Sequence, residues 1–395
     1  MNQTELYSQL TQTILPFWLN QIDEACGGFF GEVDKDLKQV KQAPKNSVMQ
    51  SRYLWAFSAS SQLISSDNLK EASAHGFIFL KEVLWDEEYG GVYWQVSHDG
   101  FVRKDKKVLY AQSFALYALS EYYKATKNEE ALALAKELFF LIETHAFRDN
   151  QMGYAEEFSR DWKEIPICEV GLADIELSYT TNTHLHLFEA YTLLYELWPN
   201  PKLLQQLHFL MNLFQEKIIQ KEGYCHQFFS GDWHSMTQEI SYGHDIETSW
   251  LLDRGQAITQ STQLNQQIIE LANYTLQHGL DVQGLMNHST DFLTTDKTKV
   301  WWVQAEAMIG FYNAYQKTQE QTFLDATETL WQAIQTYFVD KRHASEWLAY
   351  LCADNPDEQS TTKSSSISDN WKGPYHTVRM YLELIKRMEK TYDSH

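Results

Sequence analysis

The sequence has few cysteines and fewer basic than acidic residues, and both shortages exclude classes of function. The four cysteines are far apart and form no CxxC motif, so neither a disulfide framework nor a zinc site is expected. The 32 Lys and Arg residues are outnumbered by 53 Asp and Glu residues, which gives a net charge of −21. Because nucleic-acid binding requires a basic footprint and no Lys/Arg cluster is evident, we expect no nucleic-acid partner.

Long apolar runs are also missing. No stretch of about 18 apolar residues is present, so we expect no membrane-spanning helix. The N-terminal sequence MNQTELYSQL has neither a basic region nor an apolar core and predicts no signal peptide. With so few cysteines, these features favour a reducing cytoplasm. Aromatic residues, in contrast, are plentiful, with 13 Trp and 22 Tyr. They fill cores, but they also stack on sugar rings and line ligand pockets.

A sixfold internal repeat is the most informative feature of the chain. Segments that start with glycine and continue with large apolar residues recur about every 65 residues. They are GGFFGEV at Gly28, GGVYWQV at Gly91, GYAEEF at Gly153, GYCHQF at Gly223 and GLMNHS at Gly284, while a sixth, WLAYLC at Trp347, lacks the glycine. Their alternating pattern and polar turns predict short β-hairpins that join pairs of helices.

Each interval also contains segments with the apolar period of a helix. The expected helices cover 6–18, 47–64, 68–84, 108–125, 129–145, 182–197, 201–219, 244–256, 262–278, 301–317, 320–338 and 374–391. Helix pairs cannot bury their apolar faces alone, but six pairs can close into a ring. We therefore predict an all-α fold, an (α/α)6 barrel of twelve helices with short β-hairpins in the connecting loops. No linker divides the chain, so residues 1–395 should form one catalytic domain. The Ser/Thr-rich stretch 358–370 is expected to be a loop over the cavity mouth.

The segment SYGHDIETSW, residues 241–250, contains the strongest candidate cluster. His244 and Glu247 are three residues apart and share a helix face, where they can support acid/base chemistry or bind a metal. Di-metal bundles need several such pairs, and this one occurs once, so we expect no metal. The alternative is that Asp245 and Glu247 only stabilise the start of the helix.

Two further clusters have i,i+4 spacing. In VWWVQAEAM, Trp302 and Glu306 face the same way, either as a sugar-stacking platform with a hydrogen-bonding partner or as ordinary core residues. In TTNTHLHLFEAY, Asn182 and His186 share one face, and His184 lies about 200° from Asn182 around the helix. We therefore expect His186 to face the cavity and His184 to pack in the core.

Single polar residues in otherwise apolar helices are also candidates. Arg52 in SRYLWAFS is costly to bury unless it forms an ion pair or supports a developing oxyanion, and Tyr110 in VLYAQSFALY is a weaker candidate of the same kind. His376 in WKGPYHTVRM lies in the first turn of the last helix, off its apolar stripe, and is either a proton carrier or a core histidine.

All these candidate residues lie in the first helix of a pair. Because alternate helices of an α/α barrel are the inner ones, we expect them to converge on one cavity.

The segments GGFFG, SRYLWAFS, NTHLHLFEAY, GHDIETSWLL, WWVQAEA and WKGPYHTVRM follow one another over nearly the whole chain. Together they resemble the N-acylglucosamine 2-epimerase superfamily, in particular its cellobiose 2-epimerases. The resemblance implies interconversion of the C2 epimers of a reducing-end aldose, without a metal or nucleotide cofactor. The substrate would be a cellobiose- or lactose-type β-1,4 disaccharide, converted from the glucose to the mannose configuration through a cis-enediolate.

The resemblance also implies roles for individual residues. His376 and His244 would remove and return the C2 proton, Glu247 would open and close the sugar ring, and Arg52 would hold the enediolate. The remaining implied substrate-contact residues are Tyr110, Asn182, His186, Trp250, Trp302, Glu306 and Trp371. Of these, Trp302 and Trp371 would be the stacking platforms.

Substrate choice stays open at this stage. Where many disaccharide epimerases have Lys-Gly and Leu-Asn-Ser-Arg, this chain has Lys45-Asn46 and Met49-Gln50-Ser51-Arg52. A mannobiose or mannose 2-epimerase and an aldose–ketose isomerase of the same superfamily are the alternatives. A glycoside hydrolase on the same barrel, with Glu247 and Glu306 as its carboxylate pair, is a further one. The expected partner is a small sugar, bound by a monomer or weak homodimer.

Overall fold

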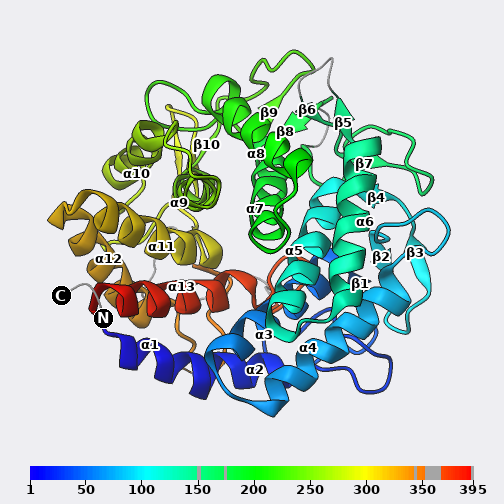
Figure 1. Cartoon of the computed structure of the whole chain (residues 1–395). Helices are drawn as coiled ribbons and strands as arrows, with labels where there is room; N and C mark the ends of the chain where they lie inside the picture. Colours follow the sequence, from blue (N-terminus) through cyan, green and yellow to red (C-terminus); the bar gives the residue numbers. More distant parts are fainter. Residues whose placement is uncertain (149–152, 173–175, 342–344, 352–365, 393–395) are drawn as a thin grey trace.

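Two concentric rings of helices make up the computed structural model (Figure 1), as the sequence predicts. The structure describes residues 1–148, 153–172, 176–341, 345–351 and 366–392. Most of the Ser/Thr-rich stretch expected to cover the cavity mouth, residues 358–365, lies outside the described residues. Among the helices in the described part of the chain, none combines the length and apolar character that a membrane span requires.

The inner ring consists of six helices, each in contact with the next, and the last also contacts the first. They are α3 (Ser47–Leu63), α5 (Leu109–Thr126), α7 (Thr181–Leu197), α9 (Tyr242–Thr259), α11 (Trp301–Thr318) and α13 (Tyr375–Tyr392). Neighbours surround these helices on all sides, so α3 is buried continuously from Ser47 to Ser60 rather than along one stripe. Polar residues on such helices must therefore bind one another or line a cavity.

The outer ring covers the inner one. Its helices are α4 (Asp67–Phe79), α6 (Glu129–His145), α8 (Pro201–Leu213), α10 (Asn265–His278) and α12 (Gln321–Ala333), each packed on the inner helix that precedes it. The sixth outer position is taken by the N-terminal segment, which runs through α1 (Gln3–Gln9), a π-helical turn (Leu10–Ile14) and α2 (Leu15–Leu19). Because α1 packs on α13, the first and last helices form the sixth pair, as expected.

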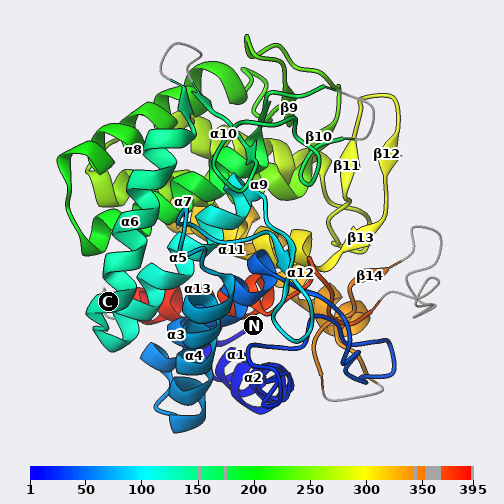
Figure 2. The same cartoon turned by 90° about the vertical axis from the view of Figure 1, so that its right-hand side faces the viewer.

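Short antiparallel strands join neighbouring repeats at the end of the barrel where the inner helices begin. The strand before an inner helix pairs with a strand of the following repeat. The pairs are β1 (Lys45–Asn46) with β2 (Gln95–Val96), β4 (Lys107–Val108) with β7 (Glu157–Phe158), β8 (Tyr179–Thr180) with β9 (Phe228–Phe229), β10 (Ile240–Ser241) with β11 (Ser289–Thr290), and β13 (Lys299–Val300) with β14 (Tyr350–Leu351). A bridge between Val33 and Ser368 joins the two ends of the chain in the same way. Figure 2 shows β10 to β14 gathered on one side of the molecule.

True hairpins are also present. They are formed by β2 with β3 (Val102–Lys104), β5 (Phe147–Arg148) with β6 (Gly153–Tyr154), and β11 with β12 (Thr295–Asp296). The predicted hairpins thus exist, but much of the pairing crosses from one repeat to the next. This pairing fixes where each inner helix starts relative to its neighbour.

The fourth residue of most inner helices binds the backbone of a glycine segment. The amide of Gln112 accepts from the Val92 N–H and donates to its carbonyl, both at 2.8 Å, and Gln50 and Gln304 bind Phe29 and Met286 in the same two-way manner. On α7 this position holds His184, whose Nε2 accepts from the Tyr154 N–H at 3.2 Å. His184 is therefore a structural residue, as predicted from its angular position.

We predict that Gln112→Leu lowers the free energy of unfolding by about 3 kcal/mol, because both buried polar groups of Val92 lose their partner. Chemical denaturation measures the change. The control is Gln332→Leu, the same substitution at an exposed position of α12, which should leave stability nearly unchanged. Equal effects of the two substitutions would contradict this role of the fourth position.

Candidate active site

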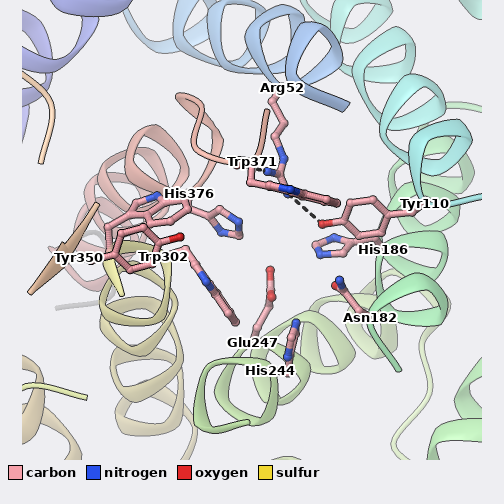
Figure 3. A pocket seen from close by; sticks show the side chains of 11 residues that line it. Arg52, Tyr110, Asn182, His186, His244, Glu247, Trp302, Tyr350, Trp371 and His376 are labelled. Atoms are coloured by element: carbon pink, nitrogen blue, oxygen red, sulfur yellow. Dashed lines mark hydrogen bonds between the residues drawn. The ribbon is translucent and has the colours of Figure 1, made fainter. Parts of the chain in front are cut away.

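A cavity of about 250 Å³ opens at the end of the barrel where the inner helices begin. It is lined by Arg52, Tyr110, Asn182, His186, His244, Glu247, Trp301, Trp302, Tyr350, Trp371 and His376. Figure 3 shows their side chains directed toward a common centre from all around the ring. Every predicted site residue except Trp250 and Glu306 therefore lies in the wall of one cavity.

The positions of these residues on their helices follow a rule. Tyr110, Asn182, Trp302 and His376 are each the second residue of an inner helix. Arg52, His186 and Glu247 are each the sixth residue. The second and sixth residues are one helical turn apart and share a face. Because the cross-repeat strands align the helix starts, equivalent positions on different helices lie at similar heights along the barrel.

His376 projects into the cavity with one ring nitrogen bound behind it. Its Nδ1 lies 2.7 Å from Oε1 of Glu306. Because a carboxylate oxygen accepts a hydrogen bond, Nδ1 carries the ring proton and the Nε2 lone pair is free. Burial lowers the pKa of His376 well below its usual value, and the positive charges of Arg52 and Arg379 lower it further. The imidazole is therefore neutral at neutral pH and can accept a proton.

His244 is a second neutral imidazole in the same wall. Its Nδ1 lies 2.9 Å from the Ser241 hydroxyl, which also caps the helix by accepting from the His244 backbone N–H. Burial lowers the pKa of His244 to about 3, and His186 and His288 contribute. With Nδ1 held by Ser241, Nε2 remains available to a ligand in the cavity.

The indole of Trp302 contacts both imidazoles. Its ring centroid lies 4.9 Å from that of His244 and 5.6 Å from that of His376, so the two imidazoles are no further apart than the sum of these distances. Gly243 makes room for this indole, because a Cβ at that position would approach the Trp302 ring to 2.5 Å. The two histidines and the indole thus form one compact group.

Arg52 brings a buried positive charge to the opposite wall. It donates to the Trp371 carbonyl at 2.6 Å and to the Tyr110 hydroxyl at 2.9 Å (Figure 3). Within the residues that the structure describes, no carboxylate forms an ion pair with Arg52. The structural ion pair considered from the sequence is thus not found there, and this cation remains available to an anionic oxygen.

Arg379 is the centre of a buried charge network behind the cavity wall. Its guanidinium donates to Glu189 at 2.5 Å, to Glu247 at 2.5 Å and to Glu306 at 2.6 Å. Glu189 in turn holds Nδ1 of His186 at 3.0 Å, just as Glu306 holds Nδ1 of His376. One cation thus connects three carboxylates. That of Glu247 lies in the cavity wall, and those of Glu189 and Glu306 each bind a histidine of the wall.

The number of hydrogen-bond donors differs between these carboxylates. Burial raises the pKa of Glu306, but Arg379 and the Trp250 indole, which donates to Oε2 at 3.0 Å, lower it, and Glu306 also accepts from His376. Three donors thus support the anionic form of Glu306. Within the described part of the chain, Glu247 accepts from Arg379 alone, and it points its other oxygen into the cavity (Figure 3). Burial and repulsion by Glu306 raise the pKa of Glu247 well above its usual range. Glu247 therefore presents a protonated carboxyl to the cavity at neutral pH.

Two predicted contact residues lie elsewhere than expected. Trp250 and Glu306 are fully buried and do not line the cavity, because each is turned toward Arg379: the guanidinium lies 4.8 Å above the Trp250 ring. Direct substrate contact by these two residues stays a prediction, and their position behind His376 does not favour it.

Sequence analysis missed other residues of the site. Trp301 and Tyr350 line the cavity, and Arg379 and Glu189 form the network behind it. Arg379 lies in the same stretch as His376 and carried the signal that singled out Arg52, a guanidinium in an apolar helix that must find partners. Tyr350 lies in the repeat segment that had lost its glycine, where no pattern indicated a role.

One oxygen or nitrogen from each of Glu247, Glu306 and His376 lies within 4.8 Å of the others, a spacing that could suit a metal ion. The Arg379 guanidinium already donates to both carboxylates, and Nδ1 of His376 is bound to Glu306. A cation entering this cluster would therefore have to displace an existing one.

Comparison with known proteins identifies relatives over the full length of the chain. The cellobiose 2-epimerase of Dictyoglomus turgidum is 37% identical over 394 residues, 98% of each chain. That of Ruminococcus albus is 35% identical over 389 residues, covering 97% of this chain and 98% of its own. The solved cellobiose 2-epimerase from Bacillus thermoamylovorans B4167 superposes with a TM-score of 0.93 at 39% identity, covering 98% of this chain and 99% of its own.

A more distant match is the D-mannose isomerase of Marinomonas mediterranea, 21% identical over 407 residues and 98% of each chain. The profile of the N-acylglucosamine 2-epimerase family matches residues 28–377. That match spans every inner helix from α3 to the start of α13, and with it all the residues that line the cavity. The chain belongs to the N-acylglucosamine 2-epimerase family.

Proposed function

We propose that this protein is a carbohydrate epimerase that interconverts the C2 epimers of a reducing-end aldose. One observation carries the proposal: two neutral imidazoles from different helices, His244 and His376, contact the same indole and each has its Nδ1 bound away from the cavity. Epimerisation requires removal of a proton from one face of C2 and its return to the other face. Two bases on opposite sides of a bound sugar meet that requirement.

Ring opening comes first, because the C2 hydrogen of a cyclic aldose is hardly acidic. The protonated carboxyl of Glu247 donates its proton to the ring oxygen O5 while the C1 hydroxyl gives its proton to Nε2 of one of the two cavity histidines, which breaks the C1–O5 bond and exposes the C1 aldehyde. The C2 hydrogen then lies alpha to a carbonyl. Ring closure reverses these transfers and restores the proton on Glu247.

Proton transfer at C2 follows. Nε2 of one histidine takes the C2 proton, and the electron pair moves onto the C1 oxygen to give a cis-enediolate. The positive charge of Arg52, with Tyr110, Asn182 and His186 around it, stabilises the developing oxyanion. The second histidine, which received the C1 hydroxyl proton on ring opening, gives that proton to the opposite face of C2. On ring closure the first histidine returns the proton it took from C2 to the C1 oxygen, and the product is the epimer.

The substrate we propose is a β-1,4 disaccharide of the cellobiose or lactose type, converted from the glucose to the mannose configuration. The names of the full-length relatives support it, and the half-exposed indole of Trp371 at the cavity mouth offers a stacking surface for a second sugar. The second candidate is isomerisation of mannose or a related sugar. It uses the same enediolate and returns the proton to C1, and the distant D-mannose isomerase supports it.

A glycoside hydrolase is disfavoured by the position of Glu306. Hydrolysis needs two carboxyl groups that flank the glycosidic bond. Glu306 is fully buried behind His376 and bound by three donors, so it cannot reach a substrate in the cavity. Among the described residues that line the cavity, Glu247 then has no second carboxylate to work with.

The working form we propose is one catalytic domain of residues 1–395, a monomer or weak homodimer in the cytoplasm that needs no cofactor. Free thiols at Cys26, Cys168 and Cys225 are compatible with a reducing compartment. Full activity after treatment with a chelator, and an elution volume that is independent of salt, would support this form.

Incubation of the protein with cellobiose, lactose, mannobiose, mannose and glucose in D2O tests the function. We predict C2-epimerised product that carries deuterium at C2 of the reducing sugar, highest with the β-1,4 disaccharides, as measured by NMR. A ketose with deuterium at C1 would favour the isomerase instead. Absence of any product from this panel would contradict the proposed function.

Replacement of either histidine should separate exchange from epimerisation. We predict that His376→Asn and His244→Asn each lower the epimerisation rate by at least about 100-fold. Each variant should still exchange the C2 hydrogen of one epimer with solvent, because the remaining imidazole removes and returns a proton on its own face. The matched control is His234→Asn at an exposed loop position. Wild-type epimerisation by either variant would contradict the two-base mechanism.

The pH profile follows from the shifted pKa values. Neutral imidazole is the reactive form, and because the pKa of His244 is lowered to about 3 and that of His376 is also depressed, activity falls only when the pH drops well below 6.5. The raised pKa of Glu247 keeps its proton through neutral pH, so activity is lost again at alkaline pH. We predict a bell-shaped kcat/KM with an acid limb below that of free imidazole. An acid midpoint at or above 6.5 would contradict the assignment.

A further inference from the structure

We propose that Arg379 is a positioning residue that assigns the protons of the site: its guanidinium keeps Glu306 and Glu189 as anionic acceptors for two cavity histidines and leaves the remaining proton on Glu247. The inference rests on the proposed function and deepens it. Arg379 is 1% exposed and does not line the cavity, so it acts on the substrate only through other residues.

The geometry of the guanidinium supports this role. One terminal nitrogen binds Glu189 and also contacts the Tyr375 hydroxyl, while the other binds both Glu247 and Glu306. These three carboxylates come from α7, α9 and α11, and Arg379 comes from α13. A single planar fork thus fixes side chains of four of the six inner helices.

The charge balance explains why a proton must remain. Three carboxylates and one guanidinium would leave two uncompensated negative charges in a buried site, which is unfavourable unless a carboxyl is protonated. The other charged or titratable groups that face this centre include Arg52 on α3, Tyr110 and Tyr117 on α5, His186 on α7, and Tyr375, His376 and Glu383 on α13. Only Glu247 has both a single donor and an oxygen in the cavity, so the proton resides where a substrate can receive it.

The hydrogen bond between Glu306 and His376 fixes which ring nitrogen of His376 carries the proton. Oε1 of Glu306 binds both His376 and Arg379, which are three residues apart on α13 and lie on one side of it. While Glu306 stays anionic, Nδ1 of His376 carries the proton and Nε2 stays free in the cavity. If Glu306 became protonated, nothing would hold that tautomer, and His376 would lose its place as a base.

Replacement of Arg379 by Lys, which keeps the charge but not the fork, and by Met, which removes both, tests the proposal on the full chain. We expect kcat to fall at least about tenfold with Arg379→Lys while KM changes little, since Arg379 does not touch substrate. We also expect the bell-shaped pH profile to move toward higher pH, more in Arg379→Met than in Arg379→Lys. The reason is that Glu306 and Glu247 both hold their protons more tightly when the cation is weakened or lost.

The control is Arg387→Lys, a substitution of the same kind about two turns further along α13, where the guanidinium binds Asn313 and Gln316. A merely structural role would lower the melting temperature and the active fraction of the Arg379 variants without moving the normalised pH profile. A variant pH profile that superimposes on the wild-type pH profile would therefore overturn the proposal. If Arg379→Met fails to fold, the profile of Arg379→Lys alone decides. If the wild-type protein epimerises no sugar, the proposed function fails instead.

Discussion

The guanidinium of Arg379 and the three carboxylates around it are the interaction on which the rest of the site depends. Ions buried without partners are costly, and the carboxylates come from three different helices. Their mutual position is stable only because one cation binds them all. The tautomer of His376, the orientation of His186 and the proton on Glu247 are local consequences of that contact.

The barrel supplies the alignment that makes such a contact possible. Strands that cross from one repeat to the next fix the start of each inner helix, and the fourth residue of most inner helices secures the neighbouring glycine segment. The second or the sixth residue of every inner helix, or both, then lies in the cavity wall. Different side chains at equivalent positions of the repeats therefore give each inner helix a different polar group in or near the cavity wall. At the sixth position, for example, Arg52, His186, Glu247 and Glu306 give four different functions.

Glu306 and Glu247 are both sixth residues of inner helices, yet of the two Glu247 alone lines the cavity. Glu306 is bound behind the wall by His376, Arg379 and Trp250. A glycine at the second position of α9 leaves room for the Trp302 ring in the wall. Chemistry at this site depends on small residues as well as on reactive ones.

Periodicity and repeat spacing were enough to predict the twelve helices and their closure into a ring. Helical geometry alone also separates His186, which lines the cavity, from His184, which does not. Contacts between helices could not be predicted in this way. Nothing in one helix indicates that Trp250 and Glu306 turn toward an arginine on another, or that Tyr350 reaches the cavity from a strand. Arg379 could have been suspected, since an arginine in an apolar helix needs partners, but its three partners are distant in sequence.

The most direct test of the central claim is the structure of the protein with a bound open-chain alditol, the reduced and unreactive form of the proposed disaccharide. The account predicts that C2 of the reducing-end unit lies between His244 and His376, with Nε2 of each within about 3.5 Å on opposite faces of that carbon. A complex in which both imidazoles lie on the same face of C2, or in which one is too distant to reach it, would contradict the account.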